Sequence, residues 1–440
     1  MARVVVVGAG VSGLATAEWL QPDHDVVVLE AGPRAGGNVH SERVDGVVLE
    51  RSANGFLDNE PAMARLIARL QLGDQVLPAQ DGARYLFHGG ELVSVPTGPI
   101  SLLKSPLLPW WAKLRLALEP WQGPGAADET VAAFAARRLG RLAGERLVGT
   151  MVLGIWAGKA EELSLPACFP KMRQLEREHG SLIRAMRARR ADPSVAAGPP
   201  GHLTSFRLGL GTLTRALAAR LDVRTGVRVT GLRPGWVVET TEGEQRADAV
   251  VLATPAWASA ELLGPLDDDG ASALAAVPYA PVAVVCQTFS EGTLALPGGF
   301  GVLVPRAAGL DVLGTLFTSN LFPDHAPGGR AVVRSMVGGA VRPELPGLED
   351  SALVGRVQAA NAQLLGPLPD PEHTAVFRHP RGIPQYTLGH LDRVARVRAA
   401  EGRQRGLFVT GNHLEGVAIK DCVRDGERTA SRVAAMWAAG

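Results

Sequence analysis

The chain has 440 residues, and its 45 Lys and Arg nearly balance its 44 Asp and Glu, which leaves a formal net charge of +1. Without a strongly basic field the composition disfavours a nucleic-acid partner, while 46% hydrophobic residues suffice for the cores of several domains. Three cysteines lie far apart without a CxxC pair or a histidine cluster, which argues against a disulfide framework and a metal site and fits a reducing cytoplasm.

The first residues carry the clearest pattern of the chain. RVVVVGAGVSGLATAEWL at 3–20 predicts a buried strand, a glycine turn and a helix, and HDVVVLEAG at 24–32 predicts a second buried strand. This is the β-α-β unit of a parallel, doubly wound sheet. We therefore predict an α/β fold.

Later segments alternate between helical and strand-like patterns. Helical spacing occurs at 61–72, 96–190 and 416–437. Strand patterns occur in a hairpin at 84–95, at 227–232 and 247–257, throughout 281–339, and at 406–412. A stretch with proline and glycine at 191–202 predicts a linker.

Between the first strand and helix lies GAGVSG at 8–13, a GxGxxG pattern. In this pattern the first glycine permits a tight turn, the second lets a pyrophosphate approach the backbone, and the third lets the helix pack on the strand. The phosphates then meet unpaired N–H groups at the positive end of the helix dipole. Glu30 ends the second strand, where a carboxylate accepts from ribose hydroxyls. A purely structural turn is the alternative, but this context favours a dinucleotide site.

The residues after Glu30 favour a flavin over a nicotinamide. Arg34 and the pair Gly36–Gly37 suit a second backbone pass beside a diphosphate. GLG at 209–211 lacks a third glycine and predicts a helix start, so no separate NAD(P)H domain is expected. A flavin without its own nicotinamide reductant indicates an oxidase.

The segments GAGVSGLATA and VVVLEAGPRAGG resemble the flavin amine oxidase and phytoene desaturase superfamily. Within it, the chain is similar to the protoporphyrinogen oxidase family of haem biosynthesis over nearly its whole length. The similarity is carried by GGELVSVPTGPISLLKSPLLP, GIWAGKAEELS, GFGVLVP, LGTLFTSNLFPDHAP, GIPQYTLGH and GNHLEGVAIKDC.

The resemblance implies an amine-oxidase-like architecture. A discontinuous Rossmann-like FAD-binding domain would be combined with a β-rich substrate domain and an α-helical membrane or channel insert. The expected boundaries are 1–80, 205–260 and 399–440 for the FAD domain, 81–90 and 261–398 for the substrate domain, and 91–204 for the insert.

FAD is the cofactor that the resemblance implies, and it assigns the following binding residues. They are Gly8, Ala9, Gly10, Val11, Ser12, Gly13, Glu30, Ala31, Arg34, Gly37, Asn38, Ser52, Ala53, Asn54, Gly55, Val229, His379, Gly416, Val417 and Ala418. Asn54 would lie beside the isoalloxazine ring, the Val229 backbone would meet the adenine, and His379 would stand where a relative has Trp. Residues 416–418 would point helix N–H groups at the flavin pyrimidine edge, where reduction places negative charge. Lys420 departs from the family pattern, in which Asn is common.

For the substrate, the resemblance implies a porphyrinogen site. Arg84 matches the propionate-binding arginine, since a guanidinium grips a carboxylate bidentately. The apolar positions that sandwich the rings match Leu303, Leu316 and Met336, and Gly154 matches a glycine that faces the substrate cavity. Asn54 is also a candidate for orienting the substrate.

The expected reaction is the FAD-dependent oxidation of a porphyrinogen by O2, acting on CH–CH groups. A hydride passes from a meso carbon to the flavin, O2 is reduced to hydrogen peroxide, and three cycles give the porphyrin. No side chain is assigned as an essential base, because protons leave from pyrrole N–H groups. Alternatives are the coproporphyrinogen III oxidase reaction, an amine oxidase or carotenoid desaturase, and a non-catalytic binding module.

The insert segment SLLKSPLLPWWAKLRLALEPW, at 101–121, combines tryptophans, leucines and spaced lysines, as interfacial segments do. It equally suits a channel mouth or an ordinary helical core. We expect no signal peptide and no spanning helix, because the chain enters a strand directly and has no apolar run of about 18 residues. The resemblance implies a homodimer, and we expect a cytoplasmic location with peripheral contact to the inner face of the cell membrane.

Overall fold

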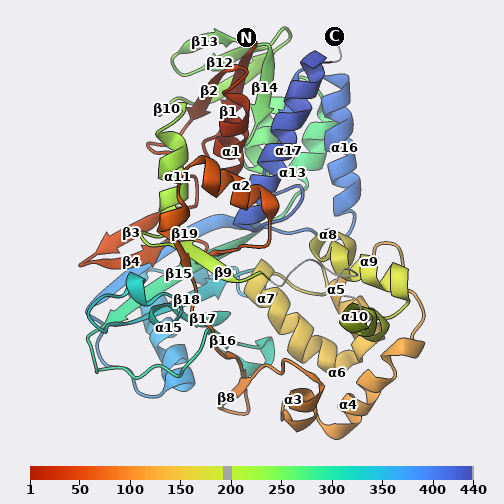
Figure 1. The fold of residues 1–440 in the computed structure, drawn as a ribbon, viewed down its shortest axis with the longest axis vertical. Coiled ribbons are helices and arrows are strands. Elements are labelled where there is room, and N and C mark those ends of the chain that lie inside the picture. Colours follow the sequence, from red (N-terminus) through yellow and green to blue (C-terminus); the bar gives the residue numbers. More distant parts are fainter. Residues whose placement is uncertain (192–200, 439–440) are drawn as a thin grey trace. The chain divides into compact units, whose positions relative to one another are not determined.

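The computed structural model describes residues 1–191 and 201–438, and the chain divides into two compact units (Figure 1). Unit 1 consists of Met1–Pro78, Gly201–Pro278 and His390–Gly440, and unit 2 of Ala79–Pro200 and Tyr279–Gly389. Each unit is therefore assembled from segments that are distant in sequence.

These units differ in part from the expected boundaries. Residues 261–278 and 390–398, which the sequence placed in the β-rich domain, lie in unit 1. The linker expected at 191–202 lies mostly outside the described residues. The finer division of the chain stays a prediction.

The centre of unit 1 is a five-stranded sheet with strand order β10-β2-β1-β14-β20. Its strands are β1 (Arg3–Val7), β2 (Asp25–Glu30), β10 (Asp222–Thr225), β14 (Ala249–Leu252) and β20 (Leu407–Val409). Every pairing in this sheet is parallel, which confirms the predicted α/β fold. The helices of unit 1 are α1 (Val11–Leu20), α2 (Pro61–Arg69), α11 (Gly211–Ala218), α12 (Ala256–Leu263), α13 (Asp268–Ala275), α16 (His390–Arg403) and α17 (Ile419–Ala438).

Three small sheets complete unit 1. They are β3 (Ser41–Val44) with β4 (Val47–Glu50), β5 (Phe56–Leu57) with β9 (Leu203–Phe206) and β6 (Val76–Pro78), and β11 (Val229–Arg233) with β12 (Val237–Thr240) and β13 (Gly243–Arg246). A 3₁₀ helix, η1 (Gly73–Gln75), precedes β6.

The core of unit 1 explains its unbroken valine runs. Residues 4–7 of β1 are all buried, as expected for a parallel strand covered on both faces. Val4 and Val6 share a buried cluster with Leu14 of α1 and Val423 of α17. Burying each such side chain stabilises the fold by ~1.5–3 kcal/mol, so the two helices are held firmly on the sheet.

Unit 2 contains a mixed seven-stranded sheet with order β19-β15-β18-β17-β16-β7-β8. Its strands are β7 (Arg84–His88), β8 (Glu91–Ser94), β15 (Tyr279–Phe289), β16 (Gly301–Leu303), β17 (Gly314–Phe317), β18 (Ala331–Gly338) and β19 (His373–Pro384). Antiparallel pairing of β7 with β8 confirms the predicted hairpin. Short helices η4 (Arg306–Ala308), α14 (Thr318–Leu321), η5 (Pro323–His325) and η6 (Leu345–Gly347) lie between strands, and the longer α15 (Asp350–Leu365) follows β18.

One face of this sheet packs against α15. Val285, Phe317 and Val333 from three neighbouring strands share a buried cluster with Leu353 and Val357 of that helix. Because side chains alternate between the faces of a strand, the residues between these positions point to the opposite face of the sheet.

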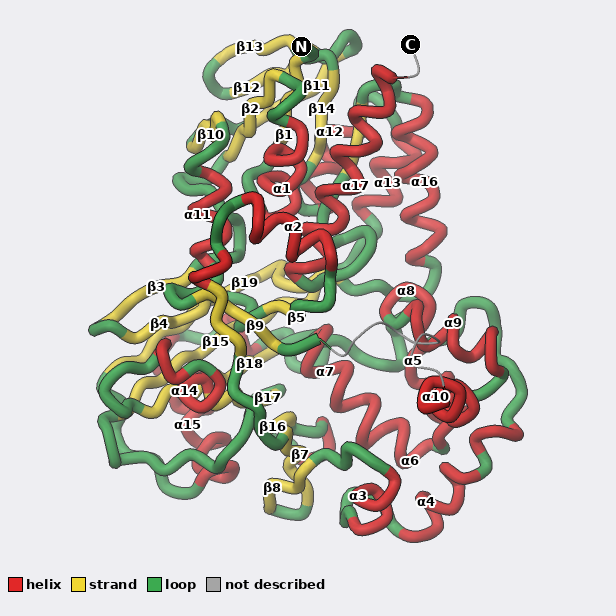
Figure 2. The backbone as a smooth tube through the Cα atoms, in the orientation of Figure 1, coloured by secondary structure: helices red, strands yellow, loops and turns green. Residues whose placement is uncertain are grey.

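The region 96–190 is helical, as predicted (Figure 2). Its helices are α3 (Pro99–Lys104), α4 (Trp110–Ala117), η2 (Glu119–Trp121), α5 (Val131–Leu139), α6 (Arg141–Ala143), η3 (Gly144–Gly149), α7 (Thr150–Trp156), α8 (Leu165–Cys168), α9 (Pro170–His179) and α10 (Leu182–Ala191). Within residues 1–191 and 201–438, no helix combines the length and apolarity that crossing a membrane requires.

Buried charges join several of these helices. The Arg138 guanidinium, 1% exposed, donates to Glu176 at 2.8 Å and to the Gly180 carbonyl at 2.9 Å. Glu119 accepts from the backbone N–H of Leu182 at 2.9 Å. Since buried charges are tolerated when they are paired and hydrogen-bonded, this cluster ties α5, α9 and α10 together.

Candidate active site

The glycine loop at 8–13 connects β1 to α1. Gly8 has a φ of +105°, and a Cβ at Gly13 would lie 2.0 Å from the Gly8 carbonyl oxygen. The turn requires glycine at position 8, and the approach of α1 to β1 requires it at position 13. At Gly10 a Cβ would meet no described atom within 4 Å, and no side chain caps α1 there. The amino end of α1 is therefore open to a phosphate.

A second backbone segment, residues 34–38, lies against this loop. Gly36 donates its N–H to the Ala9 carbonyl at 2.7 Å, and a Cβ at Gly37 would lie 3.2 Å from Gly10 Cα. Arg34 folds over its own segment and donates to the Gly37 carbonyl at 3.0 Å. Burial lowers the pKa of the Arg34 guanidinium, and the nearby Arg51 lowers it further. The segment 34–38 thus brings positive charge and two glycines to the first loop.

Glu30 stands at the end of β2, next to the same loop. Its carboxylate accepts from the N–H of Ala9 at 2.9 Å and from the N–H of Gly32 at 2.7 Å. A carboxylate has about four lone-pair sites, so it retains capacity for hydroxyl donors. Val227 donates to the Glu30 carbonyl at 2.9 Å, which brings the start of β11, at Val229, to this end of β2.

Residues 52–55 connect β4 to β5 in unit 1. Asn54 is 7% exposed, yet neither Oδ1 nor Nδ2 has a hydrogen-bond partner among the residues that the structure describes. Leaving a buried amide group unpaired costs ~1–3 kcal/mol. The side chain is therefore suited to a bound polar group.

The C-terminal glycine turn belongs to the same unit. Gly416 has a φ of +107°, and α17 begins three residues later at Ile419. At Gly426 a Cβ would lie 3.0 Å from Ala15 Cβ and 3.1 Å from the Ser12 carbonyl. Two turns after its start, α17 thus crosses the first turn of α1, so the two glycine turns are parts of one region.

The other predicted site residues lie in unit 2: Arg84, Gly154, Leu303, Leu316, Met336 and His379. His379 is on β19, opposite Val282 of β15. Its contact with the flavin stays a prediction.

Four neighbouring strands of unit 2 align Arg84 and Leu316 in one row. Arg84 of β7 pairs with Gly301 of β16, Gly301 with Leu316 of β17, and Leu316 with Arg334 of β18. Directly paired residues point to the same face of a sheet, so this row has an arginine at each end. The Arg84 guanidinium lies over the Phe300 ring, 4.7 Å from its centroid.

A second row lies beside the first on the same face. Leu303 of β16 pairs with Gly314 of β17, and Gly314 with Met336 of β18. Gly154 of α7 faces this row, because a Cβ there would lie 2.6 Å from Leu303 Cδ2. The structure therefore brings all five predicted substrate residues of unit 2 to one face, which is apolar between Arg84 and Arg334.

Comparison with known proteins identifies the family. The model of the flavin containing amine oxidoreductases matches residues 11–434. The chain belongs to this family. A rice protein, "Protoporphyrinogen oxidase, chloroplastic", is 33% identical over 98% of this chain and 88% of its own length. The "Coproporphyrinogen III oxidase" of Bacillus subtilis is 28% identical over 98% of this chain and 97% of its own. A crystal structure from Exiguobacterium sp. 255-15 is 26% identical, covers 98% of both chains and has a TM-score of 0.87.

As a member of the flavin amine oxidoreductases, this protein is an FAD-dependent oxidoreductase. The residues of unit 1 fit that cofactor. No described atom lies within 4 Å of a Cβ at Gly10, where the amino end of α1 would meet the diphosphate, Glu30 has acceptor capacity for a ribose, and the unpaired amide of Asn54 suits the polar edge of a flavin ring. The individual contacts remain predictions.

One residue of each unit was missed by the predictions from sequence. Arg334 extends the first row of unit 2. The sequence feature that could have indicated it is a charged residue inside the apolar strand AVVRSMVG. His413 is 1% exposed, and neither ring nitrogen has a hydrogen-bond partner among the described residues. Its position in GNHLEG gave no sign of burial.

Proposed function

We propose that this enzyme oxidises protoporphyrinogen IX to protoporphyrin IX in haem biosynthesis, with O2 as acceptor and hydrogen peroxide as product. The observation that carries the proposal is the pair of rows in unit 2, where flat apolar positions and Arg84 share one sheet face. A porphyrinogen combines the matching features, a large apolar macrocycle and carboxylate arms. The name of the rice relative supports the same substrate.

In this reaction the side chains of the protein bind and orient the substrate, and they take little part in the covalent chemistry. Bound FAD supplies the two-electron oxidant that removes hydride from a meso carbon of the substrate. Leu303, Leu316 and Met336 would hold the macrocycle flat and exclude water, and Arg84 would fix its rotation by gripping a propionate. Because pyrrole N–H groups can release protons to solvent, no side chain has to act as a base.

The start of α17 would also favour the reaction electrostatically. The N–H groups of 416–418 lie at the positive end of a 20-residue helix. Developing negative charge near that end is stabilised by the helix dipole. Lys420 pairs with Asp421 at 3.5 Å, which reduces the charge that it can add.

Coproporphyrinogen III is the alternative substrate, as in the named reaction of the Bacillus relative. The chemistry at the meso carbons is the same, but this substrate has a propionate on every pyrrole ring. Turnover of both porphyrinogens by the holoenzyme, followed by porphyrin fluorescence, tests the proposal. Failure to oxidise protoporphyrinogen IX would refute it.

Replacing Arg84 tests the binding geometry. We expect Arg84→Leu to raise the KM for protoporphyrinogen about 10- to 100-fold, because charged hydrogen bonds contribute roughly 1.5–3 kcal/mol. The change in kcat should be smaller, since the contact is made equally in ground and transition states. Steady-state kinetics by porphyrin fluorescence measure both constants.

The control is Arg84→Lys, which keeps the charge but loses the planar fork, so an intermediate KM is expected. If Arg84→Leu showed wild-type KM and kcat, the propionate assignment would be wrong.

We propose further that α3, α4 and η2 form a membrane-contact surface. Its exposed apolar residues are Ile100, Leu103, Trp110, Trp111, Leu114, Leu118 and Trp121. Trp110 and Trp121 are 75% and 74% exposed, which is unusual for side chains of this size. Exposed tryptophans beside lysines are typical of segments that lie in a bilayer interface.

To test this surface, the protein is floated with anionic liposomes, and we expect the wild type to float with them. In the double variant Trp110→Ser/Trp121→Ser most of this flotation should be lost. Both side chains are exposed, so the variant should keep its flavin and activity in detergent-free assays with dispersed substrate. Equal flotation of the variant and the wild type would remove the support for this surface. We also propose a homodimer, cytoplasmic and peripheral on the inner face of the cell membrane.

A further inference from the structure

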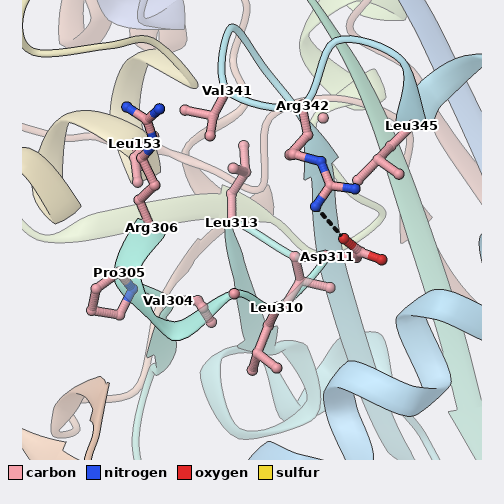
Figure 3. A pocket seen from close by; sticks show the side chains of 13 residues that line it. Leu153, Val304, Pro305, Arg306, Leu310, Asp311, Leu313, Val341, Arg342 and Leu345 are labelled. Atoms are coloured by element: carbon pink, nitrogen blue, oxygen red, sulfur yellow. Dashed lines mark hydrogen bonds and ion pairs between the residues drawn. The ribbon is translucent and has the colours of Figure 1, made fainter.

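At the end of the two rows, unit 2 contains a pocket of about 240 Å³ (Figure 3). Leu153, Leu313 and Val341 line it, and they share a hydrophobic cluster with Met336 of the second row. The pocket therefore adjoins the apolar face that the macrocycle would cover.

The charges around this pocket do not cancel. On one side Asp311 accepts from Arg342 at 2.6 Å and from Arg356 at 2.8 Å, and Arg342 also binds Glu344 at 2.6 Å. On the other side Arg306 lines the pocket (Figure 3), and its guanidinium makes no hydrogen bond or ion pair within residues 1–191 and 201–438. Arg306 is thus a cation whose charge no neighbouring carboxylate neutralises.

The position of Arg306 relates it to Arg84. Gly301 of β16 pairs with Arg84, and Arg306 follows Gly301 by five residues. At ~3.3 Å per extended residue the two backbone positions are up to roughly 16 Å apart. Leu303 lies between them, so the two arginines stand at opposite ends of the apolar wall.

We propose that Arg306 binds a second carboxylate of the substrate, on the edge of the macrocycle opposite the one held by Arg84. The inference rests on the proposed function, and it makes coproporphyrinogen III a substrate of the same site. In protoporphyrinogen the propionates are on neighbouring pyrroles, whereas coproporphyrinogen has one on each ring and can reach both arginines. The pocket is smaller than the about 300–1,000 Å³ of sites that enclose whole drug-sized ligands, and it fits one arm of the macrocycle.

The test compares Arg306→Leu with wild-type holoenzyme on both porphyrinogens. For coproporphyrinogen III we expect KM to rise about 10- to 100-fold, as for the loss of one charge-assisted contact. For protoporphyrinogen IX we expect a change of less than about twofold, because its far edge carries vinyl groups. Arg306→Lys should recover part of the affinity for coproporphyrinogen III.

Arg306 is exposed, so the variants should fold, and the flavin spectrum checks this. A matched control is Arg246→Leu, an exposed arginine of β13 in unit 1 with no side-chain partner among the described residues; its kinetics should not change. Equal effects of Arg306→Leu on both substrates, or no effect on either, would overturn the inference. Wild-type turnover of protoporphyrinogen alone would overturn it while leaving the proposed function intact, and turnover of neither would refute both.

Discussion

A Gly13→Ala enzyme is expected to be purified without flavin, colourless and less stable than the wild type. A Cβ at this position would lie 2.0 Å from the Gly8 carbonyl oxygen and 2.9 Å from Ala253 Cβ. The first neighbour is buried backbone and the second is the half-buried residue that follows β14, so α1 would have to move away from β1. We expect a loss of stability of about 3 kcal/mol, the upper end of the usual cost of overpacking, and absorbance spectra with FAD-to-protein ratios measure the loss of cofactor.

Variants at two further glycines distinguish an effect on folding from an effect on cofactor binding. In Gly355→Ala, within α15, a Cβ would meet no described atom within 4 Å, so this variant should stay yellow and be at least as stable, because alanine favours a helix over glycine. Gly10 has a φ of −73° and open space at its Cβ position, so Gly10→Ala should fold normally but bind FAD more weakly. Wild-type FAD affinity in Gly10→Ala would show that this space does not hold the diphosphate.

The glycine loop could be predicted because all its determinants are local. The strand, the three glycines and Glu30 lie within 30 residues, and each spacing has one physical meaning. The return of the chain at the C-terminus was also expected, and the approach of Gly426 to Ser12 confirms that α17 joins the first helix.

The arrangement of the substrate face could not be predicted from the residues alone. Arg84 and Arg334 are 250 positions apart, and only the register of four strands puts them in one row. Sequence patterns indicate which faces are apolar, but they do not indicate which strands are neighbours. For this reason the place of Arg334 in this row was missed.

The boundaries near 261–278 and 390–398 differed from expectation for a related reason. These segments flank β-rich sequence, but their helices pack on each other in unit 1. A Cβ at Gly270 of α13 would lie 2.5 Å from Ala400 Cβ of α16, and Arg403 binds Asp267 at 2.6 Å. Contacts between helices that are 130 residues apart leave no local signal in the sequence.

Acid should destabilise this enzyme through His413, and His413→Leu should remove much of that sensitivity. Burial lowers the pKa of His413 to about 3, and the neighbouring His390 and Arg398 lower it further. Between the unfolded pKa of about 6.5 and pH 3 the unfolded chain therefore binds a proton that the folded chain does not. The contribution of His413 to the free energy of unfolding is therefore fully present above pH 6.5. It falls by about 1.4 kcal/mol for each pH unit below that value.

By pH 5 the wild type should have lost about 2 kcal/mol through this residue, and thermal melts of the holoenzyme at pH 8 and pH 5 measure the change. His413→Leu should show a smaller difference in Tm between the two conditions. At pH 8 it should be at least as stable, because replacing a buried group without hydrogen-bond partners by an apolar one is close to neutral or stabilising. His202 is exposed, so His202→Leu should keep the wild-type difference. Identical pH dependence of all three proteins would mean that the His413 ring is hydrated or protonated in the folded state, and that acid acts on the enzyme through other groups.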